Sequence, residues 1–314
     1  MNQSKKVTEG ALLIAVFAIL ILIGTFVPFS MLLIVFVLPL PFIIFTYKYR
    51  WKSALVMLGA AVILSLIIAV ISLPITALAG FGGIMIGIGL HDRLSPYETW
   101  ARGTIGFIAG LLFIFLFTQY FLEINWASEI DLVVDESFQI SKELMEQFGI
   151  AAQIEQELNI IQEQLSFITN LMPVGIAMIA IVMAFIAQWL GYKVVNRLEN
   201  QDFTFPPFRN FKLPVAVVWI YFFGLLFTLF DTDPSDIIFI VASNVVMLAG
   251  FFVALQGFSF IFFFSHFKNW SIAVPILSII FTLLFPMLLL YFIRIIGIID
   301  LGFRLRDRFS NHEN

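Results

Sequence analysis

The chain has 314 residues, of which 61% are hydrophobic and 12% charged, with a net charge of −4 and a mean hydropathy of +1.01. Soluble domains are about half apolar and a quarter charged, so this composition excludes a soluble enzyme and indicates a bilayer as the solvent. Cys is absent, which excludes disulfides and thiolate metal sites.

Apolar segments follow one another along the chain, most of them close to the about 20 residues that cross a hydrocarbon core. We place nine, at 11–28, 31–46, 53–73, 74–90, 103–122, 172–191, 213–230, 237–264 and 271–299. Polar and apolar residues do not alternate in them, so helices are expected rather than barrel strands. The sequence therefore predicts an all-α polytopic membrane protein with eight or nine hydrophobic helical segments.

Basic residues concentrate in alternate loops, which indicates an orientation. One set of loops contains Lys5, Lys6, Lys48, Arg50, Lys52, Arg93, Arg102, Lys193, Arg197, Arg209 and Lys212, and the opposite set contains a single cation, Lys142. The positive-inside rule then places the N-terminus in the cytoplasm of a multi-pass protein of the bacterial cytoplasmic membrane. A cleaved signal peptide is disfavoured, because a second apolar segment follows at once and no cleavage pattern ends the first.

The stretch from 123 to 171 is not a membrane segment, because acidic residues crowd it. They are Glu129, Asp131, Asp135, Glu136, Glu143, Glu146, Glu155, Glu157 and Glu163. Apolar residues nevertheless recur at steps of three and four, at Ile140, Leu144 and Phe148 and again at Ile154, Leu158, Ile161, Leu165, Ile168 and Met172. We expect an extracytoplasmic antiparallel helical hairpin whose acidic faces are either solvated surface or a docking post for a partner.

These features divide the chain into five parts. Membrane helices 1–5 occupy 1–122, the acidic hairpin 123–171, helix 6 172–191, a cytoplasmic basic loop 192–212, and the C-terminal membrane helices with a short basic tail 213–314. Within helix 4, Gly80, Gly83 and Gly87 share one face and predict close internal packing.

The last segment admits two topologies. Nine simple crossings would place the basic tail, with Arg304, Arg306 and Arg308, outside the cell, against the rule that orients the other loops. Pro275 and Pro286 interrupt this segment, so a re-entrant or hairpin arrangement that returns the tail to the cytoplasm is the favoured alternative. Arg294, inside the same segment, is expected to snorkel or to pair with a polar group on another helix.

Residues that could carry chemistry are scarce in the spans. The first eight segments contain no acidic or basic residue at mid-span, and the polar residues Gln119, Gln188, Ser243, Asn244 and Gln256 are expected to form hydrogen bonds between helices. The three histidines lack metal-ligand spacing, and no nucleotide loop or nucleophile motif occurs. We therefore expect no enzyme activity, catalytic residue, cofactor, metal site or nucleic-acid partner.

Several short motifs resemble the YybS-like family of uncharacterised bacterial integral membrane proteins. They are Thr8 to Leu13, Gln256-Gly257, Gly297 to Asp300 and, most specifically, the stretch Phe205, Pro206, Pro207, Phe208, Arg209, Asn210, Phe211, Lys212, Leu213, Pro214. The resemblance spans nearly the whole chain, but the family name implies no established activity.

A second resemblance covers about the first 191 residues, which look like the membrane-embedded S component of energy-coupling factor (ECF) vitamin transporters. The parallels are Ala11 and Ala15 one turn apart, the stretch Leu38-Pro39-Leu40-Pro41, and Gly82 to Gly87 ahead of a basic loop. This likeness implies six helices with both ends cytoplasmic and a docking role for the two alanines against a transmembrane coupling subunit. The acidic excursion and the three segments after Leu190 depart from the pattern.

Two functions follow as hypotheses. The first is a transport-like membrane module that binds a small molecule or lipid and hands it to a membrane protein partner. The alternative is a scaffold or regulatory protein that recruits partners through its acidic hairpin and basic cytoplasmic loops.

Overall fold

The computed structural model describes residues 3–147, 167–230 and 236–311, and all regular structure in these residues is helical. Seven of the described helices are long and apolar enough to cross a membrane, and two shorter apolar helices accompany them. The predicted class, an all-α polytopic membrane protein, is confirmed. By packing, the chain forms two compact units: unit 1 is Met1–Thr169 with Gly175–Phe205, and unit 2 is Asn170–Val174 with Pro206–Asn314.

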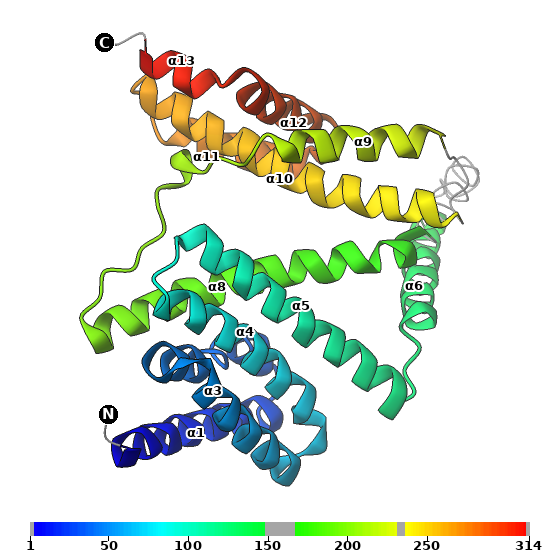
Figure 1. Cartoon of the computed structure of the whole chain (residues 1–314). Coiled ribbons are helices and arrows are strands. Elements are labelled where there is room, and N and C mark those ends of the chain that lie inside the picture. The colour runs from blue at the N-terminus through cyan, green and yellow to red at the C-terminus, as the bar shows by residue number, and fades with distance from the viewer. Residues whose placement is uncertain (1–2, 148–166, 231–235, 312–314) are drawn as a thin grey trace. The chain divides into compact units, whose positions relative to one another are not determined.

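Unit 1 is a bundle of helices in which short connections join successive helices from α1 to α6 (Figure 1). Its elements are α1 (Gln3–Phe26), α2 (Met31–Ile34), α3 (Leu40–Ile68), η1 (Val70–Ser72), α4 (Leu73–His91), α5 (Pro96–Phe121), α6 (Trp126–Gln147), η3 (Phe167–Leu171) and most of α8 (Met172–Glu199). The core lies where α4 packs between α3 and α5. Gly83 and Gly87 of α4 permit this, because a Cβ on either would meet a backbone oxygen of α3 or of the residue before it.

The second and third apolar segments are joined by a break inside α3. Arg50 has φ 64° and ψ 167°, a backbone conformation that is sparsely populated by residues other than glycine. The chain reverses there, between the cations Lys48 and Lys52. The hydropathy minimum in the sequence thus marks a real turn between two helices that share the label α3.

The first arm of the acidic excursion is α6, which is amphipathic and mostly exposed. Trp126 Nε1 donates to Thr118 Oγ1 at 2.8 Å, and Thr169 Oγ1 donates to Asp131 Oδ1 at 3.1 Å, so the end of the excursion lies beside the start of α6. The predicted second arm falls largely on residues 148–166, which lie outside the described residues. The pairing of the two arms therefore stays a prediction.

Unit 2 consists of the short η4 turn (Phe208–Asn210) and the helices α9 (Ala216–Phe230), α10 (Ile237–Phe267), α11 (Ala273–Leu284), α12 (Pro286–Phe303) and α13 (Leu305–Asn311). The Asp236 side chain caps α10 by accepting from Ile238 N at 2.7 Å. Helices α9 and α12 both pack along α10, which is the longest element of the unit.

The last apolar segment is a helical hairpin. Phe285 interrupts it, and Pro286 begins α12. At the start of a helix the backbone N–H has no partner within the helix, so the N–H that proline lacks removes no helical hydrogen bond. Two hydrogen bonds join α12 to α10 with the same offset of 44 residues, Arg294 to Gly250 and Gln256 to Asp300, so the two helices run in the same direction. The chain must therefore run back along α10 in α11, which contacts both α10 and α12, before α12 returns.

This hairpin brings the tail to one end of unit 2. Phe309 of α13 contacts Phe264 and Phe267, near the C-terminus of α10, and η4 is bonded to Ser259 of the same helix. The tail thus shares an end of unit 2 with the basic loop before α9. This arrangement corresponds to the hairpin alternative and not to a simple ninth crossing.

Single cysteines placed in this Cys-free chain should report the two sides of the membrane. Ser141→Cys should label with an impermeant reagent from outside intact cells, whereas Arg197→Cys and Arg308→Cys should label only after the membrane is opened. Labelling of Ser141 and Arg197 from the same side would overturn the orientation. If Arg308 instead labels together with Ser141, the hairpin of α11 and α12 is wrong.

Candidate functional site

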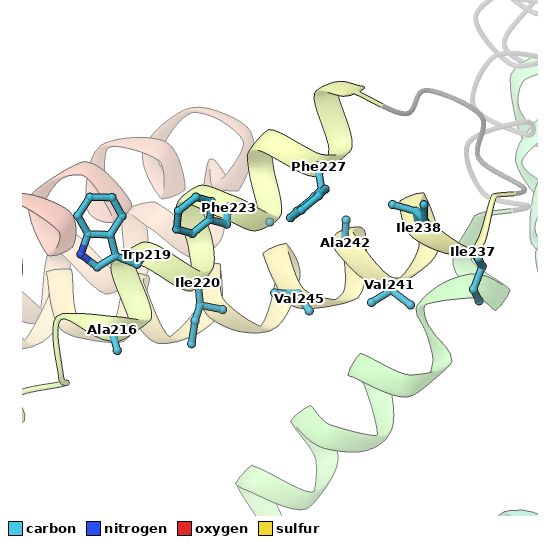
Figure 2. A pocket seen from close by; sticks show the side chains of 11 residues that line it. Ala216, Trp219, Ile220, Phe223, Phe227, Ile237, Ile238, Val241, Ala242 and Val245 are labelled. Atoms are coloured by element: carbon cyan, nitrogen blue, oxygen red, sulfur yellow. The ribbon is translucent and has the colours of Figure 1, made fainter.

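An apolar groove of about 730 Å³ lies between α9 and α10 of unit 2. It is lined by Ala216, Trp219, Ile220, Phe223, Gly224, Phe227, Ile237, Ile238, Val241, Ala242 and Val245. Figure 2 shows Phe227 of α9 directed toward the part of α10 that carries Ile238 and Ala242. The described residues that line the groove include no charged side chain, so this lining suits hydrocarbon and not a polar metabolite.

The shape of the groove follows from where the two helices touch. A Cβ on Gly224 would lie 2.9 Å from Val246 Cγ2, so α9 and α10 meet closely at this point. On α9 the lining extends from Ala216 to Phe227, which is about 16–18 Å along a helix. That length is about half of a hydrocarbon core of roughly 30 Å, the depth of one leaflet. Phe223 and Phe227 are 49% and 53% exposed, so the groove is open along its length.

A buried polar network closes the end of unit 2 that carries the tail. Arg306 and Asp300 form an ion pair in which Arg306 Nε and Nη2 each lie 2.9 Å from Asp300 Oδ2. Arg304 adopts the left-handed conformation, with φ 50° and ψ 48°, and turns the chain so that Arg306 folds back onto α12. Asp300 is 3% exposed and Arg306 8% exposed, so this pair is removed from solvent.

The same network holds the loop before α9. Arg306 Nη1 donates to the carbonyl oxygens of Arg209 at 2.7 Å and Phe211 at 3.1 Å. Ser259 Oγ lies 2.8 Å from the carbonyl oxygens of Phe208 and Phe211 and accepts from Arg306 Nη2 at 3.1 Å. The η4 turn and the residue that follows it are thereby fixed against α10.

Gln256 completes the network. Its Nε2 donates to Asp300 Oδ2 at 2.5 Å and its Oε1 accepts from Leu213 N at 3.0 Å. The expectation that this residue bonds between helices is confirmed. We call the set Gln256, Ser259, Asp300 and Arg306 the tail network.

The tail network brings together three stretches that the sequence singled out separately: residues 208–213, Gln256-Gly257 and Gly297 to Asp300. Within the first, Phe208 stacks on Phe211 and meets Phe262 edge-on. Arg209 contributes its carbonyl, and Lys212 and Pro214 are exposed. Pro206 and Pro207 lead into η4, whereas Phe205 belongs to unit 1, where it packs against Phe185 and Tyr192.

Sequence reasoning missed Arg306, which it counted only as one charge of a basic tail, and Ser259. The signal for Arg306 was an acidic residue, Asp300, at the end of an apolar segment and six residues before an arginine. Such a carboxylate must find a partner if it is buried.

The docking candidates of the N-terminal half, Ala11 and Ala15, both lie on an exposed face of α1. The neighbouring Gly10 points the other way, toward the Phe45 ring of α3. The alanines are therefore not used for packing inside unit 1.

A small charged cavity of about 430 Å³ lies at one end of unit 1, with Lys48 in its lining. Lys48 Nζ lies 2.7 Å from Glu9 Oε2 and 3.0 Å from Glu199 Oε1, so the ion pairs connect α1, α3 and α8. Because these charges neutralise one another in ion pairs, we interpret the cluster as a structural link between the three helices. Among the described residues, no group of three or more His, Asp or Glu side chains could hold a metal ion.

The helices, their apolar surfaces and the polar closure of unit 2 define a polytopic α-helical membrane protein. The chain belongs to the family described as "Predicted membrane protein (DUF2232)", whose profile matches residues 15–301. It is also 29% identical over 319 residues to "Uncharacterized protein YybS" of Bacillus subtilis (strain 168), a match that covers 98% of this chain and 99% of that protein. The resemblance to the YybS-like family is thereby confirmed. No solved structure matches the chain.

Proposed function

We propose that this protein is a non-enzymatic, transport-like membrane module that holds a lipid acyl chain in the groove between α9 and α10. The observation that supports this proposal most directly is the size of the groove. Its volume of about 730 Å³ falls within the range of about 300–1,000 Å³ that ligand sites occupy. Its apolar lining and its length of about 16–18 Å match one hydrocarbon chain within one leaflet.

Filling the groove should displace its lipid. Ala242 is buried in the lining, so Ala242→Phe adds a ring where the acyl chain is proposed to lie. Native mass spectrometry after gentle extraction should then show a lipid adduct on the wild type that is reduced at least several-fold in the variant. Met247→Phe is the matched control, because Met247 lies on the same helix, is exposed and does not line the groove. Equal loss in both variants, or none in Ala242→Phe, would refute the groove as the binding site.

A second candidate function, docking of a membrane protein partner on α1, is favoured by the exposure of Ala11 and Ala15. Small residues let two helix backbones approach closely in lipid, where van der Waals fit drives association. In this version the resemblance of the N-terminal half to an ECF S component reflects a shared docking mode.

Ala11→Leu combined with Ala15→Leu should abolish co-purification of that partner from native membranes. The fold should survive, since both positions are exposed and leucine is well accommodated in hydrocarbon. Ile19→Leu with Ile23→Leu, at exposed positions of the same helix, keeps the volume and should retain the partner. A well-folded alanine variant that keeps every partner would rule out docking at this face.

A further inference from the structure

Arg294 is a cation at the middle of a membrane helix. It lies nine residues before the end of α12, which is about 14 Å along a helix and thus close to the centre of a hydrocarbon core of roughly 30 Å. Ionisable residues at such depth are rare and usually mark a functional contact.

The side chain of Arg294 does not snorkel toward either surface. Its Nε donates to the carbonyl oxygen of Gly250 at 3.2 Å, and this pair has the same offset of 44 residues as Gln256 and Asp300 farther along the two helices. The guanidinium therefore reaches sideways to α10 at its own level. Of the two expectations for this residue, contact with another helix is the one that the structure shows.

Gly250 provides the space for the guanidinium. A Cβ at this position would lie 3.0 Å from Arg294 Cζ, which is tighter than ordinary packing allows. The Tyr221 ring of α9 borders the same space, because its Cε2 would lie 3.1 Å from that Cβ, and the ring lies 5.9 Å from Arg294 Cζ. The niche is thus built from three helices, with a backbone carbonyl and an aromatic ring as its polar features.

The charge of Arg294 has no counterion among the described residues. A guanidinium has five N–H donors, and one of them, on Nε, is engaged by Gly250. Arg306, only twelve residues later, instead has a buried carboxylate, two carbonyls and a hydroxyl around it. The contrast matters because an uncompensated cation in hydrocarbon is costly, whereas a paired one is tolerated.

We propose that Arg294 binds the oxyanion headgroup, a carboxylate or phosphate, of an amphipathic lipid-like molecule at the level of Gly250. Arg294 lines none of the α9–α10 groove, so this site is separate and stands even if the groove is empty. Arginine suits the role because its planar fork binds carboxylate and phosphate in a bidentate manner.

A flexible amphiphile fits this niche better than the carboxylate of a partner helix. Arg294 is recessed, whereas its neighbours Tyr291 and Ile295 on α12 are 66% and 47% exposed. A headgroup on a flexible chain can pass between such side chains. A partner helix is rigid, so the exposed Tyr291 and Ile295 side chains would keep its carboxylate away from Arg294.

Thermal unfolding in uncharged maltoside micelles tests the proposal, in mildly alkaline buffer so that carboxylates are ionised. Hexadecanoate, hexadecyl phosphate and the neutral hexadecanol are each added at a small mole fraction of the micelle. One or both anions should raise the Tm of the wild type saturably by several degrees, and hexadecanol should not. A rise in Tm with hexadecanoate indicates a carboxylate headgroup, and a rise with hexadecyl phosphate indicates a phosphate headgroup.

Three variants separate this site from a general effect of charge. Arg294→Gln should abolish the rise and, without ligand, should be no less stable than the wild type, because it removes an uncompensated charge. Arg294→Lys keeps the charge and should retain a reduced rise. Arg308→Gln, at an exposed cation of α13, should respond like the wild type.

A rise that persists in Arg294→Gln, or no rise in the wild type with either anion, would overturn the proposal. Loss of a co-purifying membrane protein from Arg294→Gln, with no anion response in the wild type, would instead assign the counterion to a partner's carboxylate. Because the groove variant Ala242→Phe leaves Arg294 intact, it should keep the anion response, so the two proposals can fail independently.

Discussion

Replacing Asp300 with Asn should lower the free energy of unfolding of unit 2 by about 3–5 kcal/mol, the typical cost of leaving one member of a buried ion pair uncompensated. Asp300 Oδ2 accepts from Arg306 and from Gln256, and Asp300 and Arg306 are almost fully buried. Asparagine preserves the shape and one acceptor oxygen but removes the negative charge. Unfolding by denaturing detergent, followed by circular dichroism, measures the difference.

A double-mutant cycle shows whether the charge pair itself is responsible. Arg306→Gln should also destabilise the unit, since Asp300 and the carbonyls of Arg209 and Phe211 lose their donor. The double variant should cost less than the two single changes together, because no uncompensated charge remains. Arg308→Gln, exposed on the same helix, serves as the control and should change stability by less than about 0.5 kcal/mol. Additive losses would show that the pair is not coupled.

Most of the fold could be predicted from the sequence because the bilayer leaves few alternatives. A run of about 20 apolar residues must be helical, and cations that interrupt such runs mark the ends of crossings. The break at Arg50 illustrates this: hydropathy separates the second and third segments there, and the structure reverses the chain at that residue. The proline at 286 likewise predicts the break that begins α12.

The candidate sites were less accessible to sequence reasoning, because they depend on contacts between distant residues. Arg306 contacts Ser259, Phe211 and Arg209, which lie 47 to 97 residues away in the sequence. These contacts depend on the left-handed turn at Arg304, and the sequence has no glycine at that position to indicate a turn. The groove depends on how far α9 stands from α10, which hydropathy does not encode. The motif residues 208–213 were identified by resemblance alone, and only the structure gives them a shared role.

The close contact between α10 and α12 is the condition for both polar sites of unit 2. A Cβ on Gly297 would overlap the carbonyl oxygen of Val253, and a Cβ on Gly257 would overlap that of Ile293. The two backbones therefore nearly touch at this crossing, as small residues allow in membrane bundles. One turn on either side of it, Arg294 reaches Gly250 and Asp300 reaches Gln256.

Gly297→Ala should therefore destabilise unit 2, by about 1–3 kcal/mol, although alanine is the better helix former. The methyl group would push α12 away from a backbone atom that cannot rotate aside, and the hydrogen bond between Gln256 and Asp300 would lengthen. Gly302→Ala is the matched control in the same helix, because no heavy atom lies within 4 Å of its added Cβ. That control should be neutral or stabilising by up to about 1 kcal/mol, through helix propensity alone. Detergent-induced unfolding of the two variants side by side should give shifts of opposite sign, and equal shifts would contradict the close crossing on which the tail network and the Arg294 niche both depend.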